Sequence, residues 1–300
     1  MSPSLTVLIP THGRSALLER TLKSVALSER PQGYDGCIVV ENGLQEGAES
    51  IVSRVAEEYP NARICYLHHT QANKSAALNA ALAGLPDERL VILLDDDIRV
   101  GTQALKAYAD AAFRRPSHYY GGPVDCDYER VPPDWLIPSL PMSARGFRGT
   151  DGINTTFFLG CNWAAFAGDL RHMGGFDPNH GPGSPTGARG QESVAQDNLR
   201  SNGVLPEYVP DALVWHYVPL ERCSVAWTVQ RKYQVGLMAG LRENPVPLPR
   251  RAYLVSRMAV SCVLFGLRGN REQACHRFME FVRHGGALIA TARSRMAPNS

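Results

Sequence analysis

Three consecutive carboxylates, Asp95, Asp96 and Asp97, follow an aliphatic run from Val91 to Leu94. An uninterrupted aliphatic run predicts a strand that is buried on both faces, as in parallel sheets. Acidic residues directly after such a strand lie where open α/β sheets bind ligands. Because three adjacent like charges repel one another, the cluster favours a neutralising cation, and its oxygen ligands suit Mg²⁺ or Mn²⁺ held together with substrate phosphates. The alternative is a solvated acidic turn.

The elements before this triplet alternate between strands and helices. Aliphatic runs predict strands at 5–9, 37–40, 63–67 and 90–94, and apolar residues at helical spacing predict helices after a capping Ser15, around 51–55 and at 74–83. This alternation predicts an α/β fold with a doubly wound, mostly parallel sheet. The carboxyl ends of its strands meet at one crevice, so we expect Pro10, Thr11 and Glu41 to lie near the triplet in a nucleotide site.

The chain after residue 115 is richer in proline and glycine, which predicts mixed strands and loops around a second substrate. The segment 177–191 contains several of both residues and is predicted to be a mobile loop. From Ser224 onward the pattern is helical again, interrupted by a linker at 245–249, with amphipathic helices at 253–267 and 271–292. We therefore divide the chain at 1–115, 116–235 and 236–300.

The composition excludes some classes of function. With a formal charge of +2, the chain lacks the basicity of a nucleic-acid-binding protein, although residues 242–300 carry ten Arg, no Lys and three Glu. These arginine-rich helices predict either contact with an anionic membrane or packing against the domain or a second subunit. Seven scattered cysteines without a CxxC pair, and no signal peptide or spanning segment, predict a cytoplasmic protein, with peripheral contact at the inner membrane face as one option.

The segment Leu8–Arg14 (LIPTHGR) resembles the opening of the inverting glycosyltransferases of family two. This resemblance implies the GT-A fold, a Rossmann-like doubly wound sheet, here followed by C-terminal helices. It implies that 1–115 binds a nucleotide sugar, that 116–235 binds the acceptor and that Asp97 binds the metal. It also implies that Glu41 contacts the nucleotide base and that Asp95 lies near the ribose. The remaining residues assigned to the donor site are Pro10, Thr11, Arg14, Asn73, Lys74 and Asp96, the last without a defined role.

The resemblance continues downstream. The segments 160–163 and 173–177 resemble the acceptor side of the family, and Gly190-Gln191-Glu192 resembles its Gly-Glu-Asp motif, with Gln191 in place of one acid. This implies that Glu192 is the general base, while Asp197 is either its partner or a rival for the same role. His216 resembles the late histidine of the family, which binds the metal or the diphosphate. Arg222, with Arg231 and Lys232, is a candidate for binding the leaving diphosphate.

The activity implied is metal-dependent, inverting transfer of a sugar from a nucleotide diphosphate sugar to a hydroxyl or amine of a glycan, lipid-linked or small-molecule acceptor. Two alternatives remain open. A nucleotidyltransferase of related fold normally has a glycine-rich phosphate loop after its first strand, whereas the segment 10–14 has one glycine. A catalytically inactive sugar-binding or partner-binding protein of the same fold is favoured only by Gln191.

Overall fold

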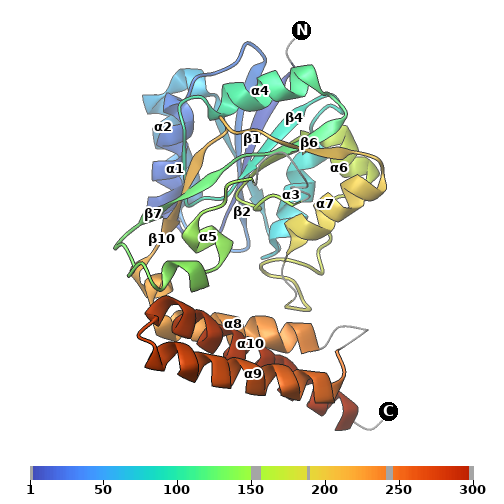
Figure 1. Ribbon diagram of the computed structural model, residues 1–300. Coiled ribbons are helices and arrows are strands. Elements are labelled where there is room, and N and C mark those ends of the chain that lie inside the picture. Colours follow the sequence, from blue (N-terminus) through green and yellow to red (C-terminus); the bar gives the residue numbers. More distant parts are fainter. Residues whose placement is uncertain (1–2, 150–156, 188–189, 241–245, 297–300) are drawn as a thin grey trace. The chain divides into compact units, whose positions relative to one another are not determined.

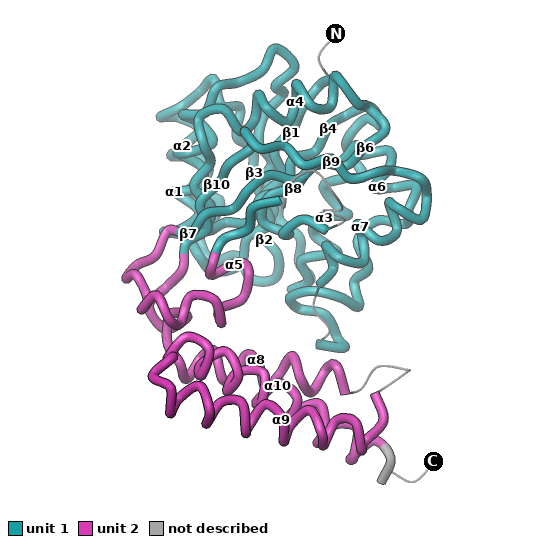
Figure 2. Tube along the Cα trace, viewed as in Figure 1, with its two compact units in different colours: residues 1–126, 146–217 teal, residues 127–145, 218–300 magenta. Residues whose placement is uncertain are grey.

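The computed structural model describes residues 3–149, 157–187, 190–240 and 246–296 (Figure 1). The chain forms two compact units (Figure 2). The first unit comprises residues 1–126 and 146–217, and the second comprises residues 127–145 and 218–300. The chain therefore leaves the first unit and returns to it before its C-terminal part begins.

A seven-stranded sheet forms the centre of the first unit. The strands lie in the order β3 (Ile64–His69), β2 (Tyr34–Asn42), β1 (Leu5–Thr11), β4 (Leu90–Leu94), β8 (Asn162–Phe166), β6 (His118–Gly121) and β9 (Leu205–Tyr208). The strands β3, β2, β1 and β4 are parallel, β8 is antiparallel to both of its neighbours, and β6 and β9 are parallel. The predicted mostly parallel sheet is thereby confirmed.

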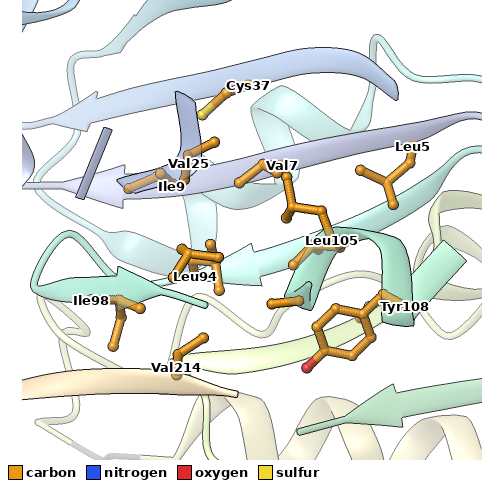
Figure 3. Packing of buried hydrophobic residues seen from close by; sticks show 14 of the residues in the cluster. Leu5, Val7, Ile9, Val25, Cys37, Leu94, Ile98, Leu105, Tyr108 and Val214 are labelled. Atoms are coloured by element: carbon orange, nitrogen blue, oxygen red, sulfur yellow. The ribbon is translucent and has the colours of Figure 1, made fainter. Parts of the chain in front are cut away.

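Helices cover both faces of this sheet (Figure 1). One face packs against α1 (Ser15–Leu27), α2 (Ala48–Glu58) and α4 (Ala104–Arg114), and the other against α3 (Lys74–Leu82), α6 (Ala167–His172) and α7 (Gln191–Ser201). Successive side chains of a strand point to opposite faces, so in β1 Val7 and Ile9 pack with the first group and Leu8 with the second. Figure 3 shows part of the first cluster, including Val7, Ile9 and Leu94. This two-sided burial explains why the strands read as continuous aliphatic runs.

A small sheet extends the first unit beyond β4. Its strands lie in the order β5 (Ile98–Val100), β10 (Val214–Val218) and β7 (Val124–Tyr128). The strands β5 and β10 are antiparallel, and His216 lies opposite Ile98. This register brings His216 next to Asp97, although more than a hundred residues separate them in the sequence.

The second unit is mainly helical. It contains α5 (Met142–Arg145), α8 (Val225–Gly240), α9 (Leu248–Leu267) and α10 (Arg271–Met296), and both α8 and α9 pack on α10. Short 3₁₀ turns lie at Pro60–Ala62 in the first unit and at Ile137–Ser139 and Leu220–Cys223 in the second. The predicted linker at 245–249 is wrong in part, because α9 starts at Leu248 and places Pro249 in its first turn, where proline needs no hydrogen-bond partner. No helix among the described residues is both long and apolar enough to cross a membrane.

Candidate active site

The acidic triplet forms the turn between β4 and β5, and a buried threonine holds its backbone. Thr21, on α1, donates a hydrogen bond to the carbonyl oxygen of Asp96 (2.9 Å) and accepts one from the backbone N–H of Ile98 (3.1 Å). The side chain of Thr21 is fully buried. Because both bonds connect α1 to a segment that lies more than 70 residues away, the backbone of the turn is fixed against the sheet before any ligand binds.

Asp96 points into the protein. Its carboxylate accepts a hydrogen bond from the hydroxyl of Thr11 (2.7 Å) and one from the guanidinium of Arg14 (3.2 Å). Burial raises the pKa of Asp96 to about 6, against the opposing charge of Arg14. Asp96 therefore forms the floor of the site and holds Thr11 and Arg14 in place.

Asp97 has one carboxylate oxygen in use and one without a partner. Oδ2 accepts a hydrogen bond from Arg14 (2.9 Å), whereas Oδ1 is buried, has no hydrogen-bond partner among the described residues and lies 3.5 Å from Nε2 of His216. An unpartnered buried oxygen is costly. A carboxylate oxygen opposite an imidazole nitrogen is a donor pair that fits Mn²⁺ or Mg²⁺, and two such ligands leave room for substrate phosphates.

Asp95 points away from the other two carboxylates and pairs with Lys74. The ammonium of Lys74 donates a hydrogen bond to Oδ1 of Asp95 at 2.5 Å. Burial lowers the pKa of Lys74, but the charge of Asp95 and this hydrogen bond outweigh it and raise the pKa above its ordinary value. Lys74 is therefore a fixed positive charge at the end of β4.

A cavity of about 300 Å³ lies above these residues, within the size range of small-ligand sites. The residues that line it come from the ends of β1, β2 and β4, the start of α3 and the segment at 182–183; they are Pro10, Thr11, His12, Arg14, Asn42, Ala72, Lys74, Asp95, Asp96, Pro182 and Gly183. Six of the predicted donor-site residues meet here. The sequence analysis missed His12, Asn42, Ala72, Pro182 and Gly183; for His12, its place directly after Thr11 was the available signal.

The loop predicted to be mobile at 177–191, of which residues 188–189 lie outside the described residues, contacts the start of α3, and its mobility stays a prediction. Three hydrogen bonds run from Asn73 Nδ2 to Pro178 O (2.8 Å), from Ser75 Oγ to His180 O (2.9 Å) and from Lys74 N to Pro182 O (3.1 Å). Gly183 has a φ of +79°, and a Cβ there would lie 1.9 Å from the carbonyl oxygen of Ala72. The wall of the cavity is therefore built by close backbone contact that only glycine permits.

Two predicted donor-site residues are fully used in internal contacts. Asn73 is buried; besides anchoring the 177–187 segment, its Oδ1 caps α3 by accepting from Ala76 N (3.0 Å). Glu41 is 1% exposed and accepts hydrogen bonds from the backbone of Glu46 (2.6 Å) and from the hydroxyl of Tyr66 (2.6 Å). The expected direct contact of Glu41 with a nucleotide base finds no support in this arrangement. Asn73 therefore positions the segment that lines the cavity at Pro182 and Gly183, and Glu41 holds the loop that follows β2.

Glu192 lies on the other side of Lys74 and Asp95. A second, small pocket of about 10 Å³ is lined by Glu192 together with Lys74, Asp95, Trp163 and other residues. Gly160 makes room for Glu192, because a Cβ at that position would lie 2.9 Å from its Cγ. Pro10, Lys74 and Asp95 line both pockets, so Glu192 lies next to the residues that bound the larger cavity.

Comparison with known proteins decides the family. The sequence pattern of glycosyl transferase family 2 matches residues 6–174, which is more than half of the chain. The chain belongs to glycosyl transferase family 2. It is 27% identical over 241 residues to the succinoglycan biosynthesis protein ExoM of Rhizobium meliloti (strain 1021), covering 77% of this chain and 72% of that protein. The predicted family is confirmed, and the protein is a glycosyltransferase.

Solved structures confirm the GT-A fold of this family 2 glycosyltransferase. The mannosyltransferase PcManGT from Pyrobaculum calidifontis, in complex with GDP-Man and Mn²⁺, matches with a TM-score of 0.57 and 22% identity, covering 98% of this chain and 76% of that one. GalNAc-T7 with UDP, GalNAc and Mn²⁺ matches with the same TM-score and 15% identity, covering 74% of this chain and 44% of that one. These likenesses concern the fold.

Asp197 and Arg222, two of the predicted site residues of this glycosyltransferase, line neither of these pockets. The side chain of Asp197 is 65% exposed and pairs with Arg200 one turn further along α7, and Asp197 lines neither pocket. Arg222 belongs to the second unit, in the 3₁₀ turn Leu220–Cys223. The first unit by itself therefore brings together Arg14, Lys74, the three aspartates, His216 and Glu192, and it leaves Asp197 on the surface.

Proposed function

We propose that this glycosyltransferase is a metal-dependent, inverting enzyme that uses a nucleotide diphosphate sugar. The observation that carries the proposal is the buried, unpartnered Oδ1 of Asp97, which faces Nε2 of His216 beside Arg14. Asp97 and His216 would hold Mn²⁺ or Mg²⁺, and a divalent cation there supplies charge neutralisation of the leaving diphosphate. Asp197, which is exposed and paired with Arg200, has no part in this arrangement.

The charges of the site support diphosphate binding. The three aspartates are countered by two cations, Arg14 and Lys74, both of which line the cavity. A divalent ion would convert this excess of negative charge into an excess of positive charge facing the donor. Arg14 would then keep Asp96 and Asp97 oriented, and Lys74 would hold Asp95 towards the sugar nucleotide. Asp95 is proposed to contact the ribose, and His12 offers an exposed ring at the mouth of the cavity.

Glu192 is the proposed general base. Its carboxylate would take the proton of an acceptor hydroxyl or amine, whose oxygen or nitrogen attacks the anomeric carbon as the bond to the diphosphate breaks. Direct attack opposite the leaving group inverts the anomeric configuration, as in inverting glycoside hydrolysis. Pro10 and the ion pair between Lys74 and Asp95 line both the larger cavity and the pocket at Glu192, so they lie between the two reacting sides.

The partners and the compartment are proposed more coarsely. The acceptor is a glycan, free or lipid-linked, in keeping with the similarity to a succinoglycan biosynthesis protein. Both guanine and uracil are candidate donor bases, because one structural relative holds GDP-Man and the other holds UDP and GalNAc. Seven free cysteines, three of them buried, suit a reducing cytoplasm, which is where we place the activity.

The test measures release of GDP or UDP from a panel of GDP- and UDP-sugars, once with Mn²⁺ and once with EDTA. We expect release of the nucleoside diphosphate with Mn²⁺ and none with EDTA. NMR of the glycosylated product should show an inverted anomeric centre. Glu192→Gln should retain Mn²⁺-dependent donor binding and lose transfer by about 10²-fold or more. Asp197→Asn serves as the matched control and should remain active. If Asp197→Asn abolishes transfer while Glu192→Gln does not, the assignment of the base is wrong.

A further inference from the structure

Helix α9 exposes large apolar side chains on one face. These side chains, which we call the exposed face of α9, are Tyr253, Val260, Val263, Leu264 and Leu267, with exposed fractions of 62%, 60%, 61%, 48% and 81%. The opposite side of the helix is buried in its own unit, where Met258 packs beside Arg277 of α10. Helix α9 therefore has two apolar faces, of which one packs inside its own unit and the other is exposed.

The positions of these residues form a continuous stripe. At 3.6 residues per turn, Tyr253, Val260, Leu264 and Leu267 fall within about 60° of the helix circumference. Arg250, Arg257 and Arg268 project along one border of that stripe. All three are exposed, and among the described residues their side chains have no hydrogen-bond or ion-pair partner. The sequence of α9, from Leu248 to Leu267, contains no Asp or Glu.

We propose that the exposed face of α9 docks on an anionic lipid surface. An apolar stripe bordered by unpaired arginines matches the boundary between acyl chains and anionic headgroups, where apolar side chains enter the boundary and guanidinium groups pair with lipid phosphates. A second copy of α9 fits less well, because it brings the same arginines and no carboxylate. The helix is not a spanning segment, so the contact is peripheral. The proposal concerns binding and does not depend on the proposed glycosyl transfer.

The test is co-sedimentation of the full chain with vesicles of phosphatidylcholine alone and with vesicles that also contain phosphatidylglycerol. We expect binding to the anionic vesicles only, weakened by added salt. Arg257→Gln should weaken binding about fivefold, which corresponds to about 1 kcal/mol per basic residue near an anionic surface. The double variant Val260→Ser with Leu264→Ser should weaken it about tenfold or more.

Matched controls replace an exposed leucine and an exposed arginine of the first unit by the same residue types, serine and glutamine. Leu27, 66% exposed, is replaced by Ser, and Arg114, exposed at the end of α4, is replaced by Gln; both variants should bind vesicles like the unchanged protein. Equal binding to both kinds of vesicle, or full binding by both α9 variants, would overturn the proposal. It would also be overturned if the chain ignores vesicles but is a dimer that the double variant converts to a monomer in light scattering, since the face would then join two copies.

Discussion

Replacing Asp97 by asparagine separates its proposed role as a metal ligand from its role in the fold. The substitution keeps the size of the side chain and an oxygen that can accept from Arg14, which at 44% exposure also retains Asp96 as a partner. It removes one of three adjacent negative charges. We therefore expect the free energy of unfolding of the metal-free protein to change by about 1 kcal/mol or less.

The stabilisation by bound ligands should differ much more between the unchanged protein and Asp97→Asn. At a concentration 100 times its Kd, a ligand that binds only the folded state stabilises it by about 2.7 kcal/mol. For the first unit, of about 200 residues, this corresponds to a rise in Tm of about 5–10 °C. The unchanged protein should show this rise with Mn²⁺ and GDP or UDP together, whichever base it accepts, and Asp97→Asn should lose it.

The assay is a thermal melt of both proteins with and without Mn²⁺ and nucleoside diphosphate, supported by calorimetric titration. Asp110→Asn, an equal change of charge on the exposed surface of α4, is the control and should keep the full rise. A full Mn²⁺-dependent rise in Asp97→Asn would refute the assignment of Asp97 as a ligand. A large fall in the metal-free Tm would refute the argument that its charge is a cost to the empty fold.

Two further predictions concern stability and loop anchoring. Asn73→Ala removes the cap of α3 and the anchor of the 177–187 segment; it should lower the free energy of unfolding by about 1–2 kcal/mol and increase hydrogen exchange in that segment, and unchanged exchange would contradict the anchoring role. In the second unit, burial raises the pKa of Glu280, but the hydrogen bonds and charges of Arg283 and Lys232 outweigh it and lower the pKa. A lowered carboxyl pKa stabilises the fold above the unfolded pKa and stops doing so as the pH falls through the folded pKa. Glu280→Gln should therefore destabilise this unit at pH 7, and the difference should disappear in acid; urea melts that differ equally at all pH values would contradict it.

The fold could be predicted because its strands are buried on both faces. The predicted strand at 90–94 coincides with β4, and the predicted helix at 74–83 is within one residue of α3. Where a polar side chain is held by a distant part of the chain, its role was predicted less well. Ser15 was expected to cap α1, but it is the first helical residue, and its hydroxyl donates to the carbonyl of Glu46, 31 residues away. Its partner depends on tertiary contact, which local pattern does not encode.

The same reason limits prediction of the site. From residue type and strand position, Thr11, Lys74, Asp95 and Asp96 were predicted to lie at one edge of the sheet, where the structure brings them together around one cavity. They did not reveal that the polar atoms of Glu41 and Asn73 are already used by the protein itself. That outcome depends on how two loops fold back onto β2 and α3, and those loops are specified by glycine conformation and backbone carbonyls rather than by a periodic pattern.

The acidic triplet explains why these loops and helices are needed. Three neighbouring carboxylates can be kept in a folded chain only if each meets a different environment, since like charges at this spacing repel strongly where water is excluded. The turn after β4 provides this by directing Asp95 to Lys74, Asp96 to Thr11 and Arg14, and one oxygen of Asp97 to Arg14. Among the buried carboxylate oxygens of the triplet, only Oδ1 of Asp97 has no hydrogen-bond partner in the part of the chain that the structure describes. If the triplet were merely a solvated acidic turn, its carboxylates would be exposed and this selective burial would have no cause. The cation proposed to enter with the substrate would supply one.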